Sequence, residues 1–128
     1  MTDIPSDLRY TEEHEYLRPA DDDSVYFVGV TDYAQGELGD VVFVELPDSG
    51  SSFNRMEVFG TIEAVKAVSD LFCPVDGTVI ESNAALDDDP SLVNSDPYGD
   101  GWMIKLKVDD DEEVRALLSS DGYADHVS

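Results

Sequence analysis

Short runs of β-branched and aromatic residues, bounded by Gly, Pro and Asp, recur along the chain. Runs of this kind are typical of β-strands that are separated by turns. They predict strands over residues 24–30, 40–46, 78–82 and 102–108. In the last run the apolar residues Trp102, Ile104, Leu106 and Val108 alternate with Met103, Lys105 and Lys107, which predicts one buried and one exposed face.

Two short helices are expected between these strands. Thr31 can cap a helix over residues 32–38, and Gly39 can end it. Pro90 can begin a single helical turn that runs to Asn94. The residues between 83 and 89 read as a polar connection.

The two ends of the chain differ in character. Residues 1–9 are mostly polar and predict a loosely held lead-in. An acidic first turn from Asp110 begins a C-terminal helix that Gly122 ends, followed by a short tail or an extra turn. The length is most simply one domain, 1–128, with a core over about 10–118. The sum is a mostly β fold of short antiparallel strands with a C-terminal helix.

The segment from Glu57 to Pro74 fits two periodicities. Some of its apolar residues fit one face of a helix and others alternate with period two, so periodicity leaves both structures open. Gly60 would weaken a helix and Pro74 would end one, which favours two strands. A hairpin with Lys66 at its tip follows, although the tip lacks the Asn-Gly or Asp-Gly pair of a tight turn.

Lys66 is one of three lysines in 128 residues, and it stands between the small apolar pairs Ala64-Val65 and Ala67-Val68. The other two, Lys105 and Lys107, point outward from a strand-like run, where cations are ordinary. One interpretation of Lys66 is a solvated lysine on a strand or helix. The other is an amine presented for covalent modification, since small neighbours leave room for a modifying enzyme.

The charge of the chain is strongly negative: 30 acidic against 7 basic residues give a formal net charge of −23. This balance disfavours nucleic acids and anionic membranes as partners. A single cysteine excludes an intramolecular disulfide, and no apolar run is long enough to span a bilayer, so a soluble cytoplasmic protein is expected. We also hypothesise a high-salt host, because salt screens the repulsion among so many carboxylates.

Catalytic groups are scarce. Cys73 lies in an apolar run that is typical of a buried structural thiol, and His126 lies in the C-terminal tail. His14 stands between Glu13 and Glu15, which predicts a raised pKa rather than a neutral base. The spacing of these residues matches no zinc site, and no calcium or phosphate loop is present. A carrier with a modified Lys66 is better supported than an enzyme.

Several sequence blocks, in a fixed order over nearly the whole chain, resemble one family, the H protein of the glycine cleavage system. The blocks are 10–15, 28–35, 38–47, 62–70, 74–79, 93–102 and 104–107. The resemblance implies a lipoyl-domain-like hybrid of barrel and sandwich, with Lys66 on a hairpin tip. It also implies that lipoate is attached through an amide to the ε-amine of Lys66.

The resemblance further implies a non-catalytic shuttle. A PLP-dependent glycine decarboxylase (P protein) would transfer an aminomethyl group to one lipoyl sulfur. A tetrahydrofolate-dependent aminomethyltransferase (T protein) would take the carbon and release ammonia. A dihydrolipoamide dehydrogenase (L protein) would then reoxidise the dithiol by thiol–disulfide exchange. A lipoylating enzyme completes the set of expected partners.

Family proteins fold the loaded arm into a surface cleft. By similarity, Glu15 and Asp70 match acidic positions that hold the ammonium of the cargo; alternatively, both are ordinary members of an acidic surface. Tyr16 stands where many members have Trp, and Ala64 where many have Ser. Glu37 occupies a region where some members place a histidine against the arm, so that contact is not transferred.

Other readings compete with the shuttle. A biotin carrier would have Met on both sides of the lysine, and lipoyl domains of 2-oxo-acid dehydrogenases usually have Asp before it; Val65 and Ala67 argue against both. An H-like protein that relays lipoyl groups to other acceptors stays open. So does a binding module in which Lys66 is unmodified.

Overall fold

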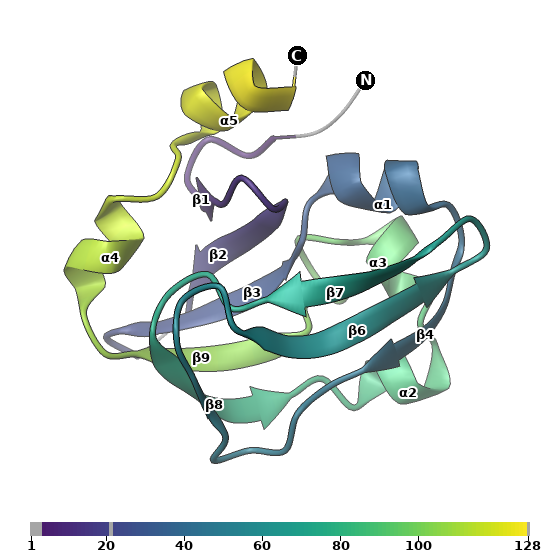
Figure 1. Ribbon diagram of the computed structural model, residues 1–128, viewed down its shortest axis with the longest axis horizontal. Coiled ribbons are helices and arrows are strands. Elements are labelled where there is room, and N and C mark those ends of the chain that lie inside the picture. The colour runs from purple at the N-terminus through teal and green to yellow at the C-terminus, as the bar shows by residue number, and fades with distance from the viewer. Residues whose placement is uncertain (1–3, 21, 128) are drawn as a thin grey trace.

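The computed structural model describes residues 4–20 and 22–127, in which short strands form two sheets that share one core (Figure 1). The strands are β1 (Arg9–Tyr10), β2 (Glu15–Pro19), β3 (Val25–Val30), β4 (Val41–Glu45), β5 (Ser52–Phe53), β6 (Val58–Ala64), β7 (Val68–Phe72), β8 (Gly77–Ser82) and β9 (Ile104–Val108). Each strand pair is antiparallel, so the predicted mostly antiparallel β fold is confirmed.

The larger sheet has the strand order β1-β2-β3-β9-β8-β5, and the smaller sheet has the order β4-β6-β7. Leu17, Val28 and Ile104 lie side by side across β2, β3 and β9, and all three side chains are buried. Val44 and Ile62 pair across β4 and β6 and join the same buried cluster from the smaller sheet. The inner faces of both sheets therefore form the core.

Met103 corrects the alternation that the sequence predicts. Its side chain is buried, although the pattern places it on the exposed face with Lys105 and Lys107. The strand begins at Ile104, so strict alternation does not extend to Met103. Cys73 is also buried; its thiol donates to the carbonyl oxygen of Val75 at 3.1 Å, and burial raises its pKa to about 12. The expected structural thiol is confirmed.

The helices are short and lie at the edges of the sheets (Figure 1). They are α1 (Asp32–Leu38), α2 (Ala85–Asp88), α3 (Leu92–Ser95), α4 (Asp111–Arg115) and α5 (Ser120–Val127). Thr31 caps α1 and Gly39 ends it, as predicted. Helix α2 was not predicted, and the expected C-terminal helix is in fact two helices. Gly122 lies inside α5 rather than at a helix end.

Aromatic residues from both ends of the chain form a second cluster. Tyr10 stacks on Tyr123 with ring centroids 4.8 Å apart, and Leu8 and Tyr16 are buried beside them. Leu8 and Tyr123 lie outside the range expected for the core. Leu8 and the partly buried Ile4 therefore anchor this part of the expected lead-in, whereas Ser6 and Asp7 stay exposed; the first three residues of the lead-in lie outside the described residues.

No helix in the described part of the chain has the length and apolar character needed to cross a membrane.

Candidate functional site

Lys66 lies at the tip of the β6–β7 hairpin (Figure 1). The strands pair as far as Glu63 and Val68, and the backbone N–H of Ala64 donates to the carbonyl oxygen of Ala67 at 2.9 Å. The tip is thus a short loop over residues 65–67, and the strand alternative for this segment is confirmed. Val65 is 72% exposed, so apolar side chains stand at the tip without burial.

The tip is fastened to the end of α1 and the start of β4. The backbone N–H of Val65 donates to the carbonyl oxygen of Asp40 at 2.9 Å, and that of Lys66 donates to Leu38 at 3.4 Å. Between these two acceptors lies Gly39, against which the side-chain methylenes of Lys66 pack. The lysine therefore projects from a fixed backbone.

The other two lysines have structural partners. Lys105 lies over the ring of Phe27 and pairs with Glu81 at 3.4 Å, and Lys107 donates to the carbonyl oxygen of Asp23 at 3.2 Å. Within residues 4–20 and 22–127, the ammonium of Lys66 has no ion pair. Its amine is therefore the one best available for modification.

A cleft of about 320 Å³ lies between β2, α1 and β7. It has the size of a small-molecule pocket. Its lining mixes acidic, aromatic and aliphatic side chains: Glu13, His14, Glu15, Val30, Tyr33, Ala34, Glu37, Leu38, Ile62, Ser69, Asp70 and Leu71. The structure thus brings the two predicted acids, Glu15 and Asp70, into one cleft.

Glu15 lies on the floor of this cleft and is 2% exposed. Its carboxyl accepts from the hydroxyl of Thr11 at 2.7 Å and from the backbone N–H of Phe72 at 3.4 Å. Burial raises the pKa of Glu15 to about 8, against the opposing effect of these hydrogen bonds. The carboxyl therefore holds its proton at neutral pH.

Asp70 is exposed on β7, where it pairs in register with Thr61 of β6. Strand β7 is the edge of the smaller sheet, and its residues Ser69, Asp70 and Leu71 form one wall of the cleft. A buried acid and a solvated acid thus occupy the same cleft. Such a pair is suited to a cationic group that enters from solvent.

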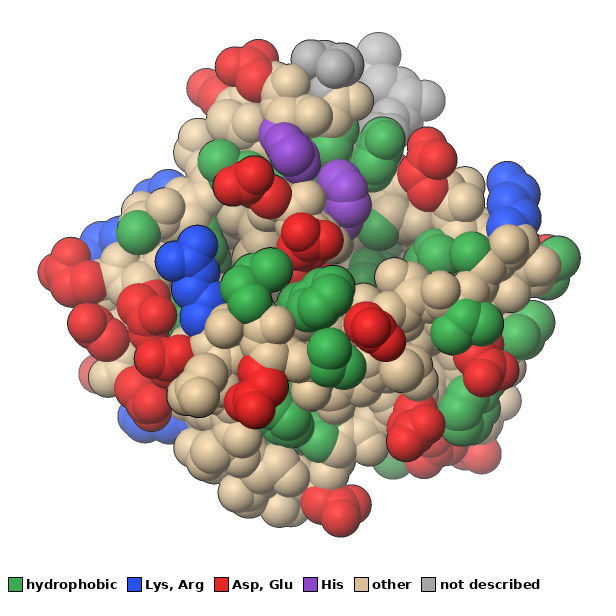
Figure 2. All heavy atoms as spheres, viewed as in Figure 1, with side chains coloured by type: hydrophobic (Ala, Val, Ile, Leu, Met, Phe, Trp, Pro, Cys, Tyr) green, Lys and Arg blue, Asp and Glu red, His purple; other side chains and the backbone are tan. Residues whose placement is uncertain are grey.

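The pKa of His14 is lowered, whereas the sequence predicted a raised pKa. Burial and the neighbouring His126 lower its pKa and outweigh the opposing effects of Glu13 and Glu37. The two histidine rings are 5.8 Å apart, and Figure 2 shows them side by side. His14 Nδ1 also lies 2.7 Å from the hydroxyl of Tyr123. Helix α5 thus supports this end of the cleft, and His126 does not lie in a loose tail.

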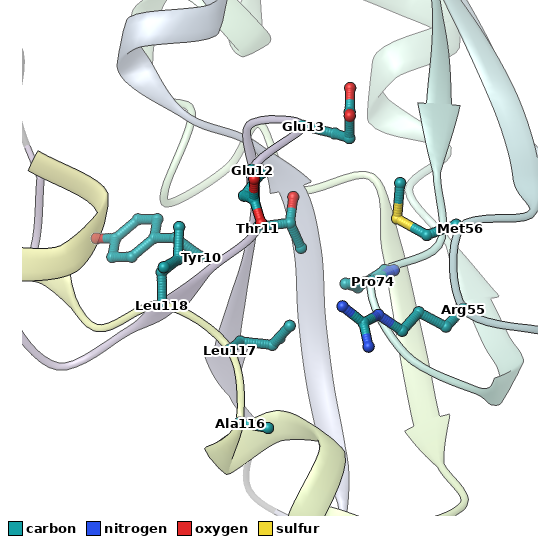
Figure 3. Close-up of a pocket in the computed structure, with 10 residues that line it drawn as sticks. All are labelled: Tyr10, Thr11, Glu12, Glu13, Arg55, Met56, Pro74, Ala116, Leu117 and Leu118. Atoms are coloured by element: carbon teal, nitrogen blue, oxygen red, sulfur yellow. The ribbon is translucent and has the colours of Figure 1, made fainter. Parts of the chain in front are cut away.

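A second hollow, of about 270 Å³, lies beside the cleft and shares Glu13 with it. Figure 3 shows Arg55 extending toward Leu117 across this hollow, with Met56 and Pro74 on the same side as Arg55. Its lining combines an arginine, two acids and apolar side chains. It contains none of the predicted site residues.

Of the residues that line the cleft, Glu15 and Asp70 were predicted from the sequence; Tyr33, Leu38 and His14 are among those that were not. Tyr33 and Leu38 could have been found from the sequence, because they lie in the helix that Thr31 caps and Gly39 ends, and such a helix turns one face to the sheet. The described residues contain no group of three or more His, Cys, Asp or Glu side chains that could hold a metal ion.

Comparison with known proteins identifies the family. The model of the glycine cleavage H-protein family matches residues 8–128. The chain belongs to this family. A probable glycine cleavage system H protein from Haloarcula marismortui is 54% identical over 125 residues, which cover 98% of this chain and 97% of that protein. A glycine cleavage system H protein from Alteromonas mediterranea is 50% identical over 127 residues, with 99% and 98% covered.

A solved structure of the same family has the same fold. The crystal structure of a glycine cleavage system H protein from Mycobacterium marinum aligns with a TM-score of 0.87 and 38% sequence identity. The alignment covers 97% of this chain and 98% of that chain. The expected barrel-sandwich fold and the resemblance to H proteins are both confirmed, and family membership supports the carrier function.

Proposed function

We propose that this chain is the lipoylated carrier of a cytoplasmic glycine cleavage system, in one domain, with lipoate joined by an amide to Lys66. The observation that carries the proposal is the position of Lys66. Its amine stands on a fastened hairpin tip, and the cleft beside that tip contains Glu15 and Asp70. An amine that is accessible, unpaired and next to a cleft suits a swinging arm.

The proposed partners are glycine decarboxylase, aminomethyltransferase, dihydrolipoamide dehydrogenase and a lipoylating enzyme. When bound, lipoate supplies a dithiol–disulfide pair that takes up the aminomethyl group and later gives it back. The chain contributes position and shelter and acts without a catalytic residue of its own. Small side chains at Ala64 and Ala67 leave the amine open to these enzymes.

Glu15 and Asp70 are proposed to hold the ammonium of the aminomethyl cargo. A cation that enters the cleft lowers the pKa of the buried Glu15 carboxyl, so that its proton leaves and the carboxylate remains. Asp70 adds a second negative charge from β7. Because the cleft excludes water from the cargo, hydrolysis is slowed.

Intact mass of the protein purified from its native host tests the modification. We expect an added mass of one lipoyl group, located by peptide mapping at Lys66 and not at Lys105 or Lys107. Replacing Lys66→Arg keeps the charge and is expected to abolish the added mass. An unmodified mass in cells that are replete in lipoate would instead favour the unmodified binding module.

Labelled glycine separates the shuttle from a lipoyl relay. With purified glycine decarboxylase, the lipoylated carrier is expected to acquire label from glycine, whereas the Lys66→Arg variant is not. A carrier that stays unlabelled but passes its lipoyl group to another acceptor protein would establish the relay instead.

The cleft acids are tested by the rate at which the loaded carrier loses its cargo. We expect Glu15→Gln and Asp70→Asn each to raise this rate roughly tenfold, since a hydrogen bond to a charged group is worth about 1.5–3 kcal/mol. Asp88→Asn removes one negative charge from α2, outside the cleft lining, and serves as the matched control. An unchanged rate in the double variant would contradict the role of both acids.

A further inference from the structure

We infer that the bare Cα of Gly39 supports the methylene chain of Lys66 and aims the arm at the cleft, and that Asn94 is the positioning residue that holds Gly39 in place. Leu38, Gly39 and Asp40 together are called the lysine seat. The inference rests on the proposed function of Lys66. It adds a structural cause for the direction in which the arm leaves the hairpin.

The contact between Gly39 and Lys66 is close. A Cβ atom added to Gly39 would lie 3.3 Å from each of Cγ, Cδ and Cε of Lys66. The side chain of Lys66 therefore lies along the backbone of Gly39 instead of projecting straight into solvent. Gly39 also has a φ of 80°, which favours glycine. The backbone conformation thus selects glycine at this position, and an added methyl group would also displace the stem of Lys66 by a few tenths of an ångström.

The lysine seat adjoins the cleft. Leu38 accepts a hydrogen bond from the backbone of Lys66, and its side chain lines the cleft together with Glu37. An arm that runs along Gly39 toward Leu38 therefore approaches the cleft over the C-terminal end of α1. The tip of the hairpin cannot shift along this path, since Val65 is bonded to Asp40 on the other side of Gly39.

Asn94, in α3, binds the chain on both sides of the seat. Its amide nitrogen donates to the carbonyl oxygen of Gly39 at 2.8 Å and to Oε1 of Gln35 at 2.9 Å. Its amide oxygen accepts from the backbone N–H of Val41 at 2.8 Å. The side chain thus links the last turn of α1 to the first residue of β4. Asparagine is the shortest side chain that offers two donors and an acceptor, which are the three groups used here.

The direct test is the NMR spectrum of the labelled, unmodified protein. We expect NOEs between the Hα protons of Gly39 and the side-chain methylene protons of Lys66. Replacing Asn94→Asp keeps the acceptor for Val41 but loses both donors, so these NOEs are expected to disappear. Asn83→Asp is the matched control, because the amide nitrogen of Asn83 also donates two hydrogen bonds, in this case to the backbone carbonyls of Asp100 and Trp102. The control is expected to keep the NOEs.

The second measurement is cargo loss from the loaded carrier. Asn94→Asp is expected to raise the rate about fivefold, the factor that corresponds to one ordinary net hydrogen bond, and Asn83→Asp to leave it unchanged. Gly39→Ala places a methyl group where the stem of Lys66 lies, and it is expected to raise the rate as well. This variant tests the seat even if Asn94→Asp does not fold.

The outcomes separate the inference from the proposed function. Missing NOEs in the unsubstituted protein, NOEs that persist in Asn94→Asp, or an unchanged rate of cargo loss in Gly39→Ala would each overturn the inference while leaving lipoylation at Lys66 intact. A protein without lipoate at Lys66 would overturn the proposed function, and the NOEs would still report on the seat.

Discussion

Glu15 has a carboxyl group that the fold removes from water without giving it a cation. It accepts hydrogen bonds from Thr11 and from the edge strand β7, and burial raises its pKa to about 8. In the unfolded chain the same group ionises near its ordinary value of about 4.3. Folding therefore binds a proton at Glu15 over the pH range between these two values.

This proton linkage predicts the pH dependence of stability. Below about pH 4, Glu15 is protonated in both states and does not affect the free energy of unfolding. As pH rises toward 8, the unfolded state loses a proton that the folded state keeps, so the free energy of unfolding falls. Glu15→Gln removes this loss of stability. The free energy of unfolding of this variant relative to the unsubstituted protein should rise with pH by on the order of a few kcal/mol between pH 5 and pH 8.

Chemical denaturation of both proteins at several pH values measures this difference. Since every other titrating group is common to the two proteins, their contributions cancel in the comparison. A difference that stays constant from pH 5 to pH 8 would contradict the burial of an unpaired carboxyl at this position.

Single residues were predictable where the cause is local. Thr31 caps α1 and Gly39 ends it because both effects act within one turn of the chain. The pKa of His14 was predicted in the wrong direction, since only its sequence neighbours Glu13 and Glu15 were visible. The groups that surround it, Tyr123 and His126, come more than a hundred residues later.

At the scale of elements, the β6–β7 hairpin depends on a glycine where two backbones meet. A Cβ atom on Gly60 would lie 2.2 Å from the carbonyl oxygen of Glu45 in β4. The pairing of β6 with β7 also shifts register between Val58 and Gly60. Strand β6, which leads to the tip that carries Lys66, thus approaches β4 too closely for any side chain at Gly60.

Gly60→Ala is therefore expected to destabilise the protein by about 3 kcal/mol or more, because backbone atoms cannot move aside as a side chain can. Gly36→Ala is the matched control. An added Cβ there meets no atom within 4 Å, and in the middle of α1 it should stabilise by roughly 0.5–1 kcal/mol. Urea denaturation measures both; equal effects of the two substitutions would contradict the close approach.

Elements that form because of their local sequence were predicted, and elements that depend on distant contacts were not. Strands β3, β4, β8 and β9 follow from β-branched runs between turns and were predicted to within a few residues. The hairpin around Lys66 needed the resemblance, since its tip lacks a turn signature. Helix α5 was missed because its burial of Tyr123 depends on Tyr10 and Leu8 at the other end of the chain. Periodicity contains no information about such a partner.

At the scale of the whole molecule, the acidic residues far outnumber the basic residues that could pair with them. Against a net charge of −23, the described residues form two ion pairs, Lys105 with Glu81 and Arg115 with Glu112. Most carboxylates therefore repel one another across solvent, and that repulsion is screened over about 10 Å at 0.1 M salt and about 3 Å at 1 M.

We predict that the melting temperature rises by about 4 °C between 0.1 M and 1 M sodium chloride, as a gain of roughly 1 kcal/mol would produce in a chain of this size. Calorimetry measures the shift. A neutral osmolyte at matched osmolality controls for exclusion of solutes from the protein surface. Equal stability at low and molar salt would contradict the hypothesis of a high-salt host.

The fastening of Lys66 to Leu38 and Gly39 fixes one end of a short tether. Once lipoylated, the free end of that tether stays within reach of the cleft, at an effective concentration in the millimolar range. A cleft with an intrinsic dissociation constant near 0.1 mM, about −5.5 kcal/mol, then holds the arm roughly nine-tenths of the time, which is enough for a tenfold slowing of cargo loss. Weak binding is enough to shelter the cargo, and it leaves the arm ready to enter a partner enzyme within the same encounter.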